Sequence, residues 1–300
     1  MHTLTIADFQ KYVGLPANFD IKLLLPHQET AFRKKIHPYF SATVVEALSG
    51  SENEERKAIA ELILKAAACY TVVVGLPFLK VKLSNAGIEQ YDQDKVKNAP
   101  WWDIRDMGLS LVKIADEALS DALTAAGADP ELRSEIDFFD KVSFLPIPTP
   151  GEFDAIYSIN KSVDVYRLLV PIMQRVWRHN ILAKIKGCTI EQLSEDENLS
   201  GLIREALAFY SLHYAMRLSQ FTFITAGVVI QYDELPWQKS LLLDEKQKAA
   251  LGDEFVQIAG DALSALLSYL KDHPDDFPCY EPEDRTFTRK IIEKKSGLYL

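Results

Sequence analysis

The sequence predicts an all-α protein made of two tandem copies of a helical-bundle unit, with short extended segments and a C-terminal arm. Three observations support this fold class: apolar residues recur at helical spacing, four sequence matches relate the two halves, and a spaced-proline stretch separates them. The chain has 300 residues, 48% hydrophobic and 25% charged, which suits one large folded domain or two smaller ones.

The four matches between the halves occur in the same order. They pair residues 23–26 with 168–171, 62–70 with 202–210, 86–92 with 226–233, and 114–123 with 258–267. The offset changes only where loops are expected. This favours an internal duplication over a chance likeness between alanine-rich helices.

Each unit is expected to contain at least three substantial helices. Apolar residues follow the 3–4 spacing of one helix face over 59–74 and 104–122, and again over 202–214 and 255–269. A proline falls early in the first long helix of each unit, at Pro26 and Pro171, where it marks the first turn or bends the helix.

Glycines are expected to end the next long helix of each unit. Gly87 and Gly227 are typical of C-terminal glycine caps, and the β-favouring residues that follow them predict a short extended segment in each unit.

The domain boundaries follow from the prolines. We expect a first helical unit over residues 1–142, a semi-rigid proline-rich linker over 143–152, a second unit over 153–271, and an extended C-terminal arm over 272–300.

Composition and charge bound the functional classes. The formal net charge of −10 argues against nucleic acid and against an anionic membrane surface as partners. The three cysteines are odd in number and widely spaced, which argues against a disulfide framework or a thiolate zinc site and favours a reducing compartment. The longest apolar run, 66–79, is too short to span a membrane and indicates a buried helix. With no secretory signal at the N-terminus, the expected location is the cytoplasm.

A search for chemistry returns little. The sequence contains no nucleotide-binding, zinc-protease or serine-hydrolase motif, and no histidine has the Glu-x-x-His spacing of di-iron bundles. Cys69 is expected to be a small core residue, and His213 a core or interface histidine. We therefore expect a protein that is not an enzyme and has no cofactor and no metal site.

Two sets of residues are candidates for a functional surface. Protein partners are the expected ligands of exposed aromatic and basic side chains, here Trp101, Trp102, Trp237, Arg289 and Lys290. A competing hypothesis is a helical enzyme or small-ligand binder with a pocket between the units, lined by Tyr70, Tyr210, His213 and Gln231. A third is a nucleic-acid binder that uses the basic tail, 285–295.

The N-terminal half also resembles a known family. Its opening, Leu4-Thr5-Ile6-Ala7-Asp8-Phe9-x-x-Tyr12, leads to Ala31-Phe32-x-x-x-Ile36-x-Pro38-Tyr39-Phe40, then Val45-x-x-Leu48, a long alanine-rich helix and the turn Leu83-Ser84-x-Ala86-Gly87-Ile88. This layout resembles head-tail connector (neck adaptor) proteins of tailed phages, and is similar to uncharacterised prophage-type proteins of gut anaerobes. The likeness is one of layout, without a diagnostic motif.

The resemblance implies a structural adaptor that multiplies into a ring beneath the phage portal, without catalysis or cofactor. Its expected partners are further copies of itself, or portal and tail components, and its location would then be the virion. This chain departs from the family by carrying the unit twice, which leaves the ring stoichiometry open.

Overall fold

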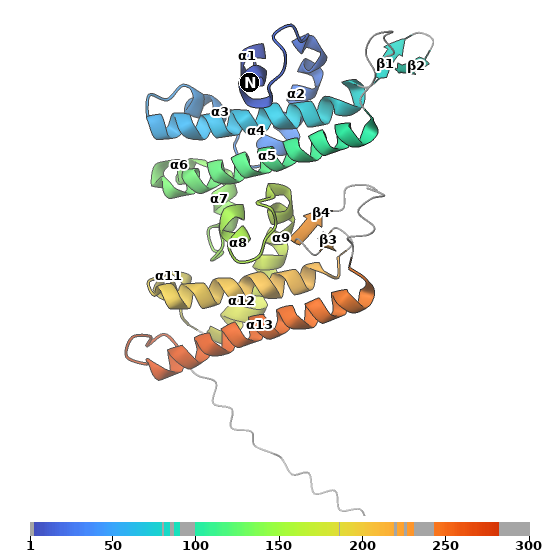
Figure 1. Cartoon of the computed structure of the whole chain (residues 1–300). Coiled ribbons are helices and arrows are strands. Elements are labelled where there is room, and N and C mark those ends of the chain that lie inside the picture. The colour runs from blue at the N-terminus through green and yellow to red at the C-terminus, as the bar shows by residue number, and fades with distance from the viewer. Residues whose placement is uncertain are drawn as a thin grey trace, which may run out of the picture.

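The structure is a computed structural model, and it describes residues 3–79, 81–84, 87–90, 100–185, 187–218, 221–224, 227–230 and 243–281. The described part is helical apart from two short hairpins, so the all-α prediction is confirmed. Figure 1 shows the helices stacked in layers: short N-terminal helices, a pair of long antiparallel helices, a second set of short helices, and a second long pair.

The first unit places five short helical segments before its long pair. These are α1 (Ile6–Val13), η1 (Ile21–Leu23), α2 (Leu25–Ala31), the π-helical η2 (Phe32–Ile36) and α3 (Ala42–Ser49). The long helices are α4 (Glu54–Leu79) and α5 (Trp101–Ala128), between which lies the antiparallel hairpin of β1 (Val81–Ser84) and β2 (Gly87–Gln90). Two short helices, α6 (Pro130–Glu135) and α7 (Asp137–Val142), follow.

The second unit repeats this order. Its short helices are α8 (Pro150–Asp154), α9 (Val163–Val176), the π-helical η3 (Trp177–Leu182), α10 (Ala183–Ile185) and α11 (Ile190–Ser194). The long helices are α12 (Glu197–Ala215) and α13 (Glu245–Asp272), and the hairpin of β3 (Phe221–Ile224) and β4 (Gly227–Ile230) lies between them in the chain.

The duplication extends to local detail. A π-helical segment follows the proline-containing helix in both units. In the long helices, the Thr71 hydroxyl donates to the Ala67 carbonyl, and the Ser211 hydroxyl, 140 positions later, donates to the Leu207 carbonyl. These shared features are those of one unit carried twice, as the sequence matches predict.

The helix starts are also equivalent. Thr5 caps α1 by accepting from the Asp8 amide, and Thr149 caps α8 by accepting from the Glu152 amide. Such a cap satisfies an amide that has no partner within the helix. One residue after each of these amides comes a fully buried phenylalanine, Phe9 or Phe153. Thus α8 stands in the second unit where α1 stands in the first.

Helix α4 forms the centre of the first unit. It packs against α1, α2, α3 and α5, and one continuous hydrophobic core extends from it into the second unit. By length and composition alone α4 could cross a membrane, but 50% of its apolar window is buried inside the protein. Its apolar character is that of the core helix that the sequence predicts.

Two sequence-based expectations need correction. The long helices end at Leu79 and Ala215, so Gly87 and Gly227 are not their caps and instead begin the second strand of each hairpin. β-favouring residues directly after each helix, such as Phe221 and Phe223, explain why an extended strand forms there before the glycine.

The segment 143–152, expected to be a semi-rigid linker, is packed into the protein. Leu145 and Ile147 are buried in the common core, and Pro150 is the first residue of α8. Because apolar residues alternate with the prolines, the stretch packs into the core that the two units share.

Candidate functional site

The two units meet at a junction with both polar and apolar contacts. Lys35 of the first unit forms an ion pair with Asp164, near the start of α9. The Tyr39 hydroxyl donates to the Val163 carbonyl at 2.8 Å. These contacts place the N-terminus of α9 on the π-helical turn of the first unit.

A buried pair of titratable groups lies beside this contact. The Tyr70 hydroxyl of α4 donates to Asp116 of α5, and Asp116 also receives a hydrogen bond from Ser162, the N-cap of α9. Burial raises the pKa of Asp116 to about 6 and raises the pKa of Tyr70 well above its usual value. The polar groups thus satisfy one another across the junction, which is what burial requires of them.

Another part of the junction is formed by α8 against α5. A Cβ placed on Gly151 would lie 3.2 Å from the Thr124 Oγ1 atom and 3.6 Å from the Ser120 Oγ atom. At the rim, Lys161 forms an ion pair with Asp121 at 2.8 Å. Ser120 is therefore fully buried by the second unit.

The matching surface of the second unit is open in the part of the chain that the structure describes. Tyr210 stands where Tyr70 stands in the first unit, and it is half-buried. Gly260 replaces Asp116, and a Cβ there would lie 3.9 Å from the Tyr210 hydroxyl oxygen. Ser264, the counterpart of Ser120, is exposed. Helix α13 packs extensively against α12, and no other described element packs against it to a similar extent.

The three described residues of the hypothetical inter-unit pocket do not meet at the junction between the units. Tyr70 lies at the junction, whereas Tyr210 faces α13. The Nδ1 atom of His213 lies 3.0 Å from the Gly252 carbonyl oxygen, and its Nε2 atom lies 3.1 Å from Arg217. Gln231 is outside the described residues. His213 is thus a bonded interface histidine within one unit, as expected.

The residues predicted to contact partners are only partly described. Trp101 and Trp102 begin α5 directly after Pro100, at the helix entry where the sequence places them, and Trp102 is 49% exposed. Trp237, Arg289 and Lys290 lie outside the described residues.

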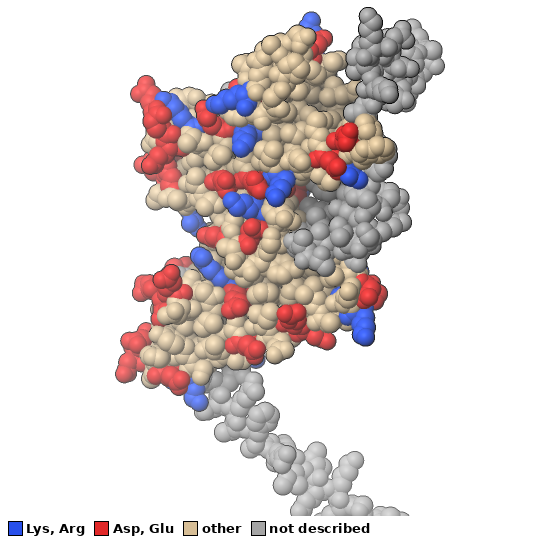
Figure 2. Space-filling model, in the orientation of Figure 1, with Lys and Arg blue, Asp and Glu red and all other residues tan. Residues whose placement is uncertain are grey.

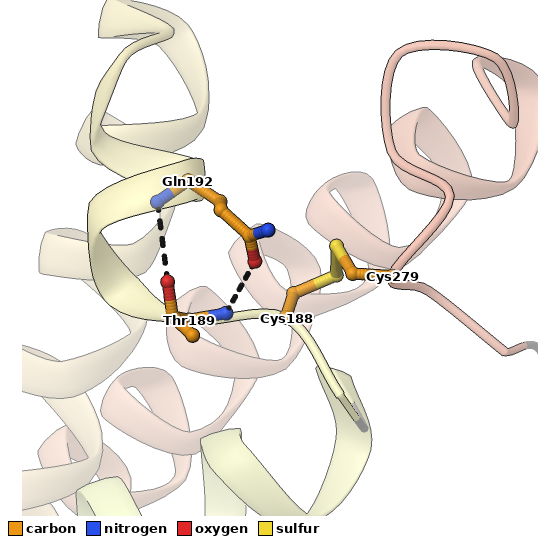
Figure 3. The surroundings of a disulfide bond; sticks show 4 residues. All are labelled: Cys188, Thr189, Gln192 and Cys279. Atoms are coloured by element: carbon orange, nitrogen blue, oxygen red, sulfur yellow. Dashed lines mark hydrogen bonds between the residues drawn. A yellow bond between two sulfur atoms is a disulfide. The ribbon is translucent and has the colours of Figure 1, made fainter.

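The cysteine prediction was wrong. Cys188, between α10 and α11, forms a disulfide with Cys279, beyond α13 (Figure 3). The two cysteines are 91 positions apart in sequence, so spacing alone could not pair them. Cys69 is free and fully buried, as predicted, and burial raises the pKa of its thiol to about 11.

The chain approaches itself closely at this disulfide. Gly187 has a positive φ of 88°, and a Cβ there would lie 2.6 Å from the Cys279 carbonyl oxygen. Next to it, Thr189 and Gln192 form a capping box that starts α11, shown by the two dashed bonds in Figure 3. The segment after α13 is therefore tied to the body of the second unit.

An acidic pocket of about 480 Å³ opens beside the disulfide. It is lined by Gln192, Glu195, Asp196, Glu197, Asp276, Phe277, Pro278 and Cys279. Carboxylates gather along this edge of both units, at the left of Figure 2, where α4 and α12 begin and α5 and α13 end. Within the described ranges, no group of three or more His, Cys, Asp or Glu side chains is placed to hold a metal.

Sequence reasoning missed the junction residues Lys35, Asp116 and Asp164. The sequence did contain a signal for one of them. When the two copies are aligned, Asp116, on an otherwise apolar helix face, corresponds to a glycine, Gly260. A charged residue in one copy and none in the other indicates that the two faces have different neighbours.

Comparison with known proteins gives one family. A family of unknown function, DUF6712, matches the chain in two segments, residues 29–124 and 172–289, one in each unit. No curated protein and no solved structure matches the chain.

Proposed function

We propose that this chain, which belongs to the family of unknown function DUF6712, is a structural assembly protein that acts through protein–protein contacts as a component of a phage or prophage head-tail connector. In this role it has no catalytic step and no cofactor. Its location is the cytoplasm of the host cell and then the virion.

The observation that carries the proposal is the junction between the units. In the first copy of the unit, helix α5 offers a face that α8 and α9 of the next copy cover, and the Lys35–Asp164 ion pair beside it is partly buried. A unit that packs on another copy of itself through a complementary face has the property that a ring-forming adaptor needs. The layout shared with neck adaptor proteins supports the same role.

The pocket hypothesis has less support. Tyr70 faces the junction, whereas Tyr210 and His213 both face α13 within the second unit, so the three described residues do not line one pocket between the units. Without convergent polar groups, a cleft has no means of orienting a small ligand.

The proposal can be tested by deleting the gene for this chain in the host strain that carries it. After phage production is induced, the cells are expected to accumulate filled heads and free tails that remain unjoined, as seen by negative-stain electron microscopy. A plasmid copy of the gene restores joined particles. The role would be ruled out if the deletion strain produced normal infectious particles, or if the host with the intact gene produced no phage particles at all.

A further inference from the structure

Among the described residues, the second unit exposes a surface whose counterpart in the first unit is buried. In α5, Asp116, Ser120 and Leu123 are buried, and of these Asp116 and Ser120 lie against Ser162 and Gly151 of the second unit. Their counterparts in α13, 144 positions later, are Gly260, Ser264 and Leu267, of which the serine is exposed and the other two are half-buried. Tyr70 of α4 is 1% exposed, whereas its counterpart Tyr210 is half-buried.

The opposite end of the chain carries the surface that complements it. Helix α1 corresponds to α8, and Ala7 takes the position of Gly151, the residue that packs on Ser120. Ala7 is exposed, because no preceding unit lies above it among the described residues. Leu23 and Leu25 at the same end are 47% and 42% exposed.

We infer that chains associate head to tail, with the N-terminal layer of a second copy (α1, η1 and α2) packed on the outer face of α12 and α13. The contact repeats the one that α8 and α9 make with α5 and η2 inside each chain. It is heterologous, so it produces a ring if the rotation closes and a filament if it does not. The inference rests on the proposed assembly role and names the partner surface for it.

The composition of the two open faces supports a second copy as the occupant. End units of repeat arrays commonly carry a polar outer face that keeps them in solution. Here, by contrast, two charged residues of the internal junction are replaced by uncharged ones on the open face of the second unit. The charged Lys35 and Asp116 of the internal junction become Asn180 and Gly260 in the second unit, and Val256 beside them is 38% exposed. A face that lacks these two charged groups and complements the other end of the same molecule favours self-association.

Cysteine cross-linking of the full chain tests the geometry. Because Gly151 lies against Ser120, the double variant Ala7→Cys/Ser264→Cys brings the new thiols of neighbouring chains within disulfide range. Mild oxidation is expected to give a ladder of covalent multimers that collapses with reductant. The matched control is Ala7→Cys/Gln257→Cys, because Lys113, the counterpart of Gln257, stays exposed at the internal junction. A ladder in both variants or in neither overturns the inference.

Mixing two blocked variants tests the polarity of the contact. Ala7→Glu blocks one face and Ser264→Glu blocks the other, and both positions are exposed, so each variant keeps its fold. By light scattering, each variant alone is expected to be a monomer of 33.9 kDa, and an equimolar mixture a dimer of twice that mass. The wild-type chain is expected to form larger assemblies as its concentration rises.

Other occupants of the open face give different results. A wild-type chain that stays monomeric at every concentration, because residues 282–300 or a different protein cover the face, overturns the inference. So does a single blocked variant that dimerises by itself, since that contact would be face to face. In either case the assembly role is judged separately, by the particles of the deletion strain.

Discussion

Reduction of the Cys188–Cys279 disulfide is expected to lower the stability of the second unit. The bond closes a loop of 91 residues that includes α11, α12 and α13. In the chain-entropy description, opening a loop of that length costs about 4.6 kcal/mol at 25 °C. With an unfolding entropy of about 2.1 cal/mol/K per residue over the chain, the corresponding fall in Tm is about 7 °C.

Two measurements check this prediction. Thiol titration in denaturant, without reductant, is expected to find one reactive cysteine, Cys69, and to find three after reduction. Calorimetry with and without reductant gives the shift in Tm. The control is the double variant Cys188→Ser/Cys279→Ser, whose Tm is expected to be low and insensitive to reductant.

Either of two results would refute the reasoning. Three reactive thiols before reduction would mean that the bond does not form. A rise from one thiol to three with no change in Tm would mean that closing the loop adds no stability.

Three further predictions concern the junction and the disulfide. Tyr70→Phe leaves Asp116 without its hydroxyl donor and is expected to cost about 1–3 kcal/mol in chemical denaturation, whereas Tyr210→Phe, whose hydroxyl bonds no described residue, is expected to cost little. The raised pKa of Asp116, about 6 against an ordinary 3.8, means that its contribution to stability is present below pH 3.8 and is lost as the pH rises through 6. Asp116→Asn should therefore flatten the dependence of the unfolding free energy on pH between about 4 and 6, and an unchanged slope would contradict this assignment. Gly187→Ala forces a Cβ against the Cys279 carbonyl at a positive φ and is expected to cost about 1–3 kcal/mol and to raise the free-thiol count.

The sequence was sufficient for the fold class because helical periodicity and internal repetition are local signals. Residues 62–70 and 202–210 carry the same apolar spacing, and both lie in long core helices. The tandem units were predicted for the same reason. The hairpins were only half anticipated, because the glycine that begins a strand and the glycine that caps a helix look alike in sequence.

The junction and the disulfide depend on contacts between distant residues, which sequence spacing does not encode. Lys35 and Asp164 are 129 positions apart, and Cys188 and Cys279 are 91 apart. The linker prediction failed for a different reason, which lies in the prolines. The stretch 143–152 has the composition of a linker, yet Leu145 and Ile147 are core residues, because apolar side chains between prolines were free to face both units.

The charged groups of the internal junction bear on how the chain folds during synthesis. The first unit emerges from the ribosome before α9 is made, and until then Lys35 and Asp116 keep its waiting face partly hydrated. When α9 arrives, Asp164 and Ser162 neutralise or hydrogen-bond these groups. A chain with two similar faces risks exchanging units with its neighbours, and a partly buried ion pair, which adds little stability, is well suited to selecting the correct partner.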